Sequence, residues 1–125
     1  MRIELPEKVS LNVMYAGVHW RRRKDLADGF HFAVLAAARK SKIEKIPKAE
    51  YPVHMEYIFF VDGKLDVSNT GAMTKLVEDG LVRAGILEAD DRKFVRKITT
   101  STEPGRKNMP AVEVVAVRNG EKVWG

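Results

Sequence analysis

The segment Lys64-Leu65-Asp66-Val67-Ser68-Asn69 is the centre of residues 59–95. The order of motifs in this stretch organises the interpretation of the rest of the chain. An alternating apolar run ends shortly before it, at Phe60, and a helical pattern follows it as far as Gly85. A second acidic segment, residues 88–91, comes directly after that helical pattern. This order of strand, polar loop, helix and acidic loop predicts two acidic loops that bracket one helix.

The composition is that of an ordinary globular protein. A chain of 125 residues with 45% hydrophobic and 31% charged residues predicts a single domain, residues 1–125. The absence of cysteine excludes disulfides and thiolate metal sites. The first six residues are too polar for a secretion signal, and no apolar run approaches the roughly 18 residues of a membrane span. We therefore expect a cytoplasmic protein with no membrane partner. The net charge of +5 is compatible with a polyanionic partner but also occurs in proteins that bind none.

The first half of the chain predicts an edge strand and a long helix. Residues 2–13 alternate weakly around Pro6, which suits an edge strand or an extended lead-in. From Asp25 the spacing is helical, with one apolar face made of Leu26, Phe30, Ala33, Val34 and Ala37. Further apolar residues lie outside that face, at Phe32, Leu35 and Ala36. The helix is therefore either deeply buried or packed with its second side against another subunit.

The second half predicts a strand, a helix and two more strands. Residues 51–61 have alternate apolar positions from Val53 to Val61. In the following helix, Ser68 or Asn69 is the expected cap, Gly85 the expected end, and Lys75, Asp79 and Arg83 form one polar row. Strands are predicted over residues 94–102 and 111–117, with a turn at 104–108 and a hairpin closed by Asn119-Gly120. This order predicts an α+β domain with two main helices packed on a mixed or mostly antiparallel β-sheet.

The acidic loops predict a divalent metal site. Magnesium takes hard oxygen ligands and usually only one or two carboxylates, which Asp66 together with Asp90 or Asp91 would supply. Mn²⁺ is an alternative ion. Such a metal polarises a scissile phosphate and lowers the pKa of an attacking water. Lys75 could offset charge that develops in the transition state. In the alternative interpretation, the acidic residues only shape turns and a helix start.

The order of these motifs resembles the central signature of RusA-type Holliday junction resolvases. The residues that carry the resemblance are Gly63-Lys64-Leu65-Asp66 with Asn69, Lys75 with Asp79-Gly80-Leu81, Ala84-Gly85-Ile86-Leu87, and Asp90-Asp91. The opening segment, with Ser10-Leu11-Asn12, Tyr15 and His19-Trp20, is also similar, so the likeness covers most of the chain up to about Val95. It implies a RusA-like fold and a magnesium-dependent homodimeric endonuclease without a small-molecule cofactor. Such enzymes nick four-way DNA junctions in recombination and repair, and are often encoded by bacterial phages or prophages.

Residue by residue, the resemblance implies that Asp66 is the first catalytic Asp, Lys75 the helix Lys and Asp91 the third catalytic Asp. It implies metal ligands at Asp66, Asp90 and Asp91, and DNA contacts at Asn69 and Lys75. Ser68 stands where the family has a second Asp, which removes a carboxylate ligand. The interval from Asn69 to Lys75 is also longer than the family pattern. The chain is therefore expected to be either a junction endonuclease or a catalytically impaired junction-binding protein of the same fold. A third alternative is an α+β interaction module whose acids are structural, which predicts no binding to junction DNA.

Basic segments surround the acidic loops. The group that we expect to contact DNA consists of Trp20, Arg21, Arg22, Arg23 and Lys24. Residues 39–48, together with Arg92, Lys93, Arg96 and Lys97, are further candidates. The alternative is that these segments are solvated surface.

The length of the second helix separates the two acidic loops. A helix over residues 70–84 spans about 22 Å at 1.5 Å per residue, which places Asp66 and Asp91 at opposite ends. The loop after the helix must therefore fold back along it, or the acidic pair of one subunit must complete the site of its partner.

Overall fold

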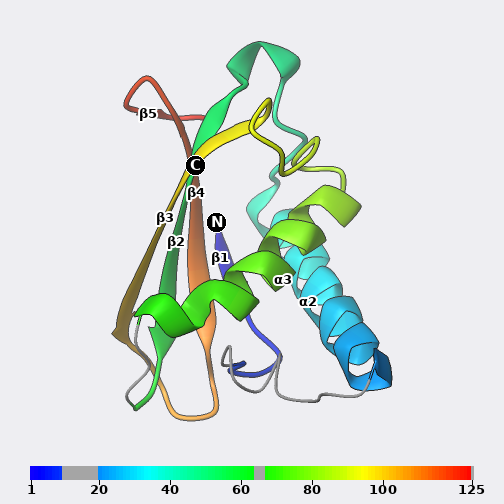
Figure 1. Ribbon diagram of the computed structural model, residues 1–125, viewed down its shortest axis with the longest axis vertical. Helices are drawn as coiled ribbons and strands as arrows, with labels where there is room; N and C mark the ends of the chain where they lie inside the picture. Colours follow the sequence, from blue (N-terminus) through cyan, green and yellow to red (C-terminus); the bar gives the residue numbers. More distant parts are fainter. Residues whose placement is uncertain (10–19, 64–66, 125) are drawn as a thin grey trace.

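The strands form one mixed sheet in the computed structural model, which describes residues 1–9, 20–63 and 67–124 (Figure 1). In chain order the strands are β1 (Arg2–Glu4), β2 (Val53–Val61), β3 (Val95–Pro104), β4 (Ala111–Arg118) and β5 (Glu121–Lys122). The sheet order is β1-β4-β2-β3, and β5 pairs with β4. β2 is parallel to β3 and antiparallel to β4. The edge position expected for the N-terminal strand is confirmed for Arg2–Glu4.

The burial of β2 follows the alternation of its sequence. Val53, Met55, Tyr57, Phe59 and Val61 are all buried, and every residue between them is partly exposed. Alternate side chains of a strand point to opposite faces, so one face of β2 lies in the core. The predicted strand and its inner face are therefore confirmed, with the strand beginning at Val53.

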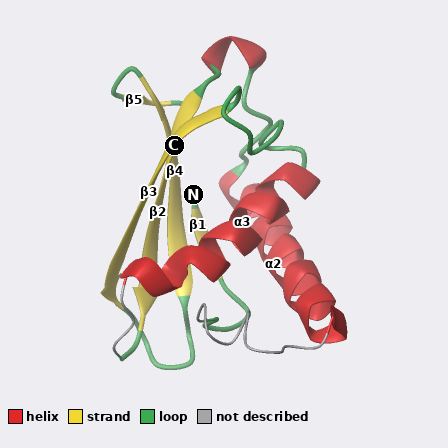
Figure 2. Ribbon diagram, viewed as in Figure 1, coloured by secondary structure: helices red, strands yellow, loops and turns green. Residues whose placement is uncertain are grey.

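Both helices pack on the same face of the sheet (Figures 1 and 2). α2 (Trp20–Ser41) and α3 (Gly71–Arg83) also pack on each other. A Cβ atom at Gly80 of α3 would lie 3.0 Å from Cγ2 of Val34, so the missing side chain permits this close approach. The α+β fold with two helices on a mixed sheet is thus confirmed. In the part of the chain that the structure describes, no helix has both the length and the apolar content needed to cross a membrane.

The outer side of α2 is exposed. Its inner face buries Leu26, Phe30, Val34 and Ala37 as predicted, whereas Ala33, also predicted for this face, is only partly buried. Phe32, however, is 66% exposed, and Ala36 is exposed as well. Deep burial of this helix on all sides, one of the two predicted alternatives, is therefore wrong. Contact of the outer side with a second subunit stays a prediction.

The connection between β3 and β4 does not form a hairpin, because β2 lies between the two strands. It crosses the end of β2 at Gly105, whose N–H donates to the backbone oxygen of Val61 at 2.9 Å. A Cβ atom at residue 105 would lie 2.5 Å from the carbonyl carbon of Phe60, so only glycine fits without movement. The predicted hairpin at Asn119-Gly120 is present, with positive φ at both residues.

The start of α3 differs from the prediction that Ser68 or Asn69 caps it. A short 3₁₀ turn, η2 (Val67–Thr70), comes first, and Thr70 occupies the N-cap position without a side-chain capping bond. The Thr70 hydroxyl donates instead to the backbone oxygen of Val67 at 2.6 Å. The predicted cap was wrong because the 3₁₀ turn moves the first residue of the helix to Gly71.

Candidate functional site

The exposed side of α3 carries the lysine of the predicted site. Nζ of Lys75 lies 3.2 Å from Oδ1 of Asp79, one helical turn further along. At the end of the helix, Arg83 forms an ion pair with Asp28 of α2, also at 3.2 Å. The predicted polar row on this helix is thus exposed and ion-paired.

The segment after α3 folds back along the helix. Gly85 has φ +77°, and the N–H groups of Ile86 and Leu87 both donate to the backbone oxygen of Leu81, at 3.0 and 3.2 Å. The side chains of Ile86 and Leu87 are buried, which fixes the segment against the core. Its next residue, Glu88, donates its N–H to the hydroxyl of Tyr51 at 2.9 Å. The chain therefore reaches the second acidic loop already directed back toward the start of the helix.

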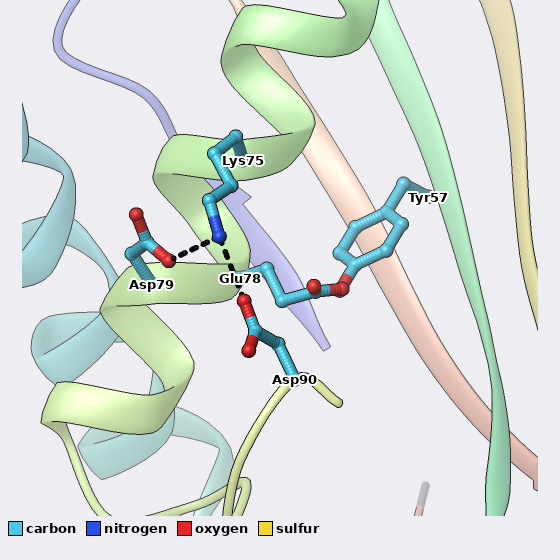
Figure 3. Close-up of polar contacts among 5 residues, drawn as sticks. All are labelled: Tyr57, Lys75, Glu78, Asp79 and Asp90. Atoms are coloured by element: carbon cyan, nitrogen blue, oxygen red, sulfur yellow. Dashed lines mark hydrogen bonds and ion pairs between the residues drawn. The ribbon is translucent and has the colours of Figure 1, made fainter. Parts of the chain in front are cut away.

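This fold-back places Asp90 on Lys75 (Figure 3). Oδ2 of Asp90 lies 2.7 Å from Nζ of Lys75, fifteen positions earlier in the chain. Lys75 is five residues past Thr70, about 7.5 Å along the helix axis. Asp90 therefore lies toward the start of α3, which follows the loop that carries Asp66. Of the two predicted ways to bring the acidic loops together, folding back within one chain is the one observed for Asp90. Sharing across a dimer stays a prediction.

Lys75 and Asp90 stabilise each other's charge. The pKa of Lys75 is raised above its ordinary value, chiefly by the hydrogen bond to Asp90 and further by Asp79, against some desolvation. The pKa of Asp90 is lowered, chiefly by the same hydrogen bond. Both groups are thus charged at neutral pH, so Lys75 acts as a fixed cation and is unsuited to donating a proton.

A buried carboxylate, Glu78, lies next to this ion pair on the same helix, one turn after Lys75 (Figure 3). Glu78 is only 5% exposed, and its Oε2 accepts a hydrogen bond from the hydroxyl of Tyr57 at 2.8 Å (Figure 3). Burial raises the pKa of Glu78, and the negative charge of Asp90 raises it further, while the Tyr57 bond lowers it. Burial likewise raises the pKa of Tyr57. Reasoning from the sequence missed this pair. The available signal was a tyrosine on the inner face of β2, because a buried hydroxyl requires a partner.

Asp91 shapes the turn that leads into β3. Its Oδ1 accepts the N–H of Lys93 at 2.9 Å, and its backbone oxygen accepts the N–H groups of Phe94 and Val95. Its side chain thus has the structural role that the alternative interpretation assigned to it, although a carboxylate retains further acceptor capacity.

The remaining predicted metal ligand, Asp66, lies outside the described residues, as do Ser10–His19. Asn69 is half-buried in η2, before the start of α3. In the described ranges, no group of three or more histidine, aspartate or glutamate side chains is placed to hold a metal ion. The structure therefore brings together Asp90 and Lys75 of the predicted site, and it does not describe Asp66.

Five of the predicted DNA-contact residues, Trp20–Lys24, begin α2, whereas Asn69 and Lys75 lie in η2 and α3. Trp20 is 62% exposed, and the guanidinium of Arg21 lies 5.6 Å from its ring centroid. Arg22 forms an ion pair with Glu7, and Arg23 and Lys24 are exposed. The first turn carries no acidic residue. Cations here oppose the helix dipole, which favours negative charge at the N-terminus. A bound anion would offset this repulsion.

Comparison with known proteins adds no relative from which a role could be transferred. Neither the models of protein families nor the curated proteins contain a match to this chain.

Proposed function

We propose that this chain is a divalent-metal-dependent endonuclease that hydrolyses phosphodiester bonds in branched DNA. The observation that carries the proposal is the Asp90–Lys75 contact, at 2.7 Å, between a folded-back acidic loop and α3. It pairs a carboxylate with a fixed cation on the helix that follows the loop of Asp66. A metal-assisted phosphoryl transfer needs both kinds of group: carboxylates for the metal and a cation for the phosphate.

The chemistry of the donor set fits magnesium or manganese. Asp66, Asp90 and Asp91 offer hard carboxylate oxygens, and magnesium often takes only one or two of these. When bound, such an ion would polarise the phosphate and lower the pKa of the attacking water.

The chain's own residues supply position and charge. Lys75 is held on α3 by Asp79 and Asp90, so its ammonium group has a defined place before DNA arrives. A preorganised cation stabilises the charge that develops on the phosphate oxygens, without reorganisation during the reaction. Arg23 and Lys24 on the first turn of α2 would contact backbone phosphates, which gives affinity and position without sequence choice.

A second candidate function is junction binding without cleavage. Ser68 stands where the resemblance calls for a carboxylate, and the positive charge of Lys75 is already balanced by its ion pairs with Asp79 and Asp90. Both features lower the expected activity but leave the basic surface intact. This candidate shares its fold and DNA partner with the first, so catalysis alone separates the two.

The experiment is cleavage of a synthetic four-way junction in Mg²⁺ or Mn²⁺ by wild type and Asp66→Asn. The control is Asp62→Asn, which removes one negative charge from a residue that forms an ion pair with Lys8 at 3.7 Å and is not among the proposed metal ligands. We expect wild type and Asp62→Asn to nick the junction symmetrically and Asp66→Asn to leave it uncut. Binding without nicking in all three proteins would favour the second candidate. No binding at low salt would contradict both.

We also propose that the active form is a homodimer, supported by the exposed Phe32 on the outer side of α2. Mixing Asp66→Asn subunits with Asp91→Asn subunits tests whether the acidic loops act across the dimer. Cleavage restored in the mixture would indicate sharing. If the mixture stays inactive, each subunit builds its own site, as the folded-back loop suggests.

A further inference from the structure

A second candidate site lies at the end of the sheet where β2 and β3 begin and β4 ends, the upper end in Figure 1. The surface there has a hollow of about 300 Å³. Its lining includes three cations, Arg96, Lys97 and Arg118, together with the polar side chains of His54 and Asn119. None of the residues proposed above to bind metal takes part in it.

An irregularity in the strand pairing gathers two of the cations. Val53 of β2 pairs with Val95 of β3, but the next residue, His54, pairs with Lys97. Arg96 is therefore an extra residue, and such bulges are rare between parallel strands and redirect side chains. Neighbouring side chains in a regular strand point to opposite faces. At this bulge, Arg96 and Lys97 line the same hollow.

The third cation is fixed by a backbone contact. Nη1 of Arg118 donates a hydrogen bond to the backbone oxygen of Tyr51, just before β2. A guanidinium has five N–H donors in a planar fork, so others remain available for a ligand. Asn119 follows directly, in the turn with positive φ that closes the β4–β5 hairpin. The hollow is thus built from a bulge, an anchored arginine and a tight turn.

No acidic side chain in the lining of the hollow balances the positive charge of its three cations. Within the described residues, the side chains of Arg96 and Lys97 make no hydrogen bond or ion pair. The nearby carboxylate of Glu56 lies 3.9 Å from Nδ1 of His54, whose Nε2 is 2.6 Å from the hydroxyl of Thr99. Like charges held close together repel, and an anion between them removes that cost. Phosphate is a suitable anion, because two of its oxygens can accept parallel hydrogen bonds from one arginine guanidinium.

We propose that this hollow binds a phosphate of a DNA backbone. The choice of DNA as the source rests on the proposed function, whereas the phosphate chemistry does not. Arg96 follows Asp91 by five residues, so the two residues lie no more than about 17 Å apart. This separation does not exceed half a turn of a DNA duplex, which is also about 17 Å. One arm of a branched DNA could therefore contact the Lys75–Asp90 site and place a backbone phosphate in the hollow.

The first test measures the salt dependence of junction binding by Arg96→Gln/Lys97→Gln. The matched control is Arg106→Gln/Lys107→Gln, which removes the same charges from exposed positions just after the other end of β3. Each lost phosphate contact lowers the slope of log affinity against log salt by about 0.9. We expect the slope to fall by about 0.9 to 1.8 in the first variant and to stay unchanged in the control. Equal changes in both variants, or none in either, would overturn the assignment to DNA.

The second test separates this inference from the proposed function. Wild type is titrated with inorganic phosphate while the amide NMR signals of His54 and Asn119, which line the hollow, are followed. We expect saturable shifts that disappear in Arg96→Gln/Lys97→Gln and persist in the control, even if the protein cleaves no DNA. Phosphate shifts without any change in the DNA slope would identify a small phosphorylated ligand as the occupant and overturn the DNA source. No shifts in wild type would overturn the site itself.

Discussion

Replacement of Tyr57 by Phe should destabilise the protein more at pH 8 than at pH 4. The hydroxyl of Tyr57 is the 2.8 Å donor to Glu78, and both residues are buried. At pH 4 the raised pKa of Glu78 keeps this carboxyl mostly protonated in the folded state, so the variant chiefly loses a hydrogen bond between neutral groups, worth about 0.5–1.5 kcal/mol. At pH 8 it loses a hydrogen bond to a charged group, worth about 1.5–3 kcal/mol.

The direction with pH follows from the raised pKa of Glu78. As pH rises through 4.5, the unfolded state releases the proton first, so stability falls until the folded-state pKa is passed. The Tyr57 bond lowers that pKa, and its removal therefore widens the pH range over which stability is lost.

Urea unfolding at the two pH values measures the difference. Tyr51→Phe is the matched control, because its hydroxyl accepts a backbone N–H and contacts no buried carboxylate. We expect the control to cost the same at both values. In the double variant Tyr57→Phe/Glu78→Leu, much of the loss at pH 8 should be recovered, because no buried charge remains unpaired. An equal loss at both pH values for Tyr57→Phe would refute the account of this pair.

Three further outcomes test other parts of the structure. Asp90→Asn should change the free energy of unfolding by less than about 1 kcal/mol, since its ion pair with Lys75 is exposed, yet it should slow junction cleavage severely. A large stability loss in urea unfolding would make Asp90 a structural residue. Gly105→Ala should cost about 1–3 kcal/mol through overpacking against the backbone of Phe60, and more than Gly29→Ala in α2, where a Cβ makes only an ordinary 3.5 Å contact with Pro6; equal losses in thermal unfolding would contradict the close approach. Arg23→Gln/Lys24→Gln should lower the salt slope of junction binding by up to about 1.8, and a slope equal to wild type would remove the first turn of α2 from the DNA contact.

The sequence predicted the elements whose pattern depends on one face of burial. β2 alternates so regularly that its inner face could be assigned residue by residue, and the apolar spacing of α2 identified Leu26, Phe30, Val34 and Ala37. In both cases local periodicity and tertiary burial agree, because each element meets the core along a single face.

Features that depend on contacts between distant segments could not be predicted in this way. The 3₁₀ turn before α3 replaced the expected cap, and β2 separates β3 from β4 although the latter two are neighbours in the chain. The Tyr57–Glu78 hydrogen bond joins residues 21 positions apart, and the local sequence around each residue does not identify the other as its partner. The fold-back of Asp90 onto Lys75 was one of two predicted geometries, and the distance argument alone did not choose between them.

The most direct test of the central claim is the position of a manganese ion, found by anomalous scattering in crystals of the protein soaked in Mn²⁺. We expect one peak in contact with carboxylate oxygens of Asp66 and of Asp90 or Asp91, from one chain or across a dimer axis. If those carboxylates lie far apart, with no ion between them even after the dimer axis is applied, the nuclease proposal is contradicted.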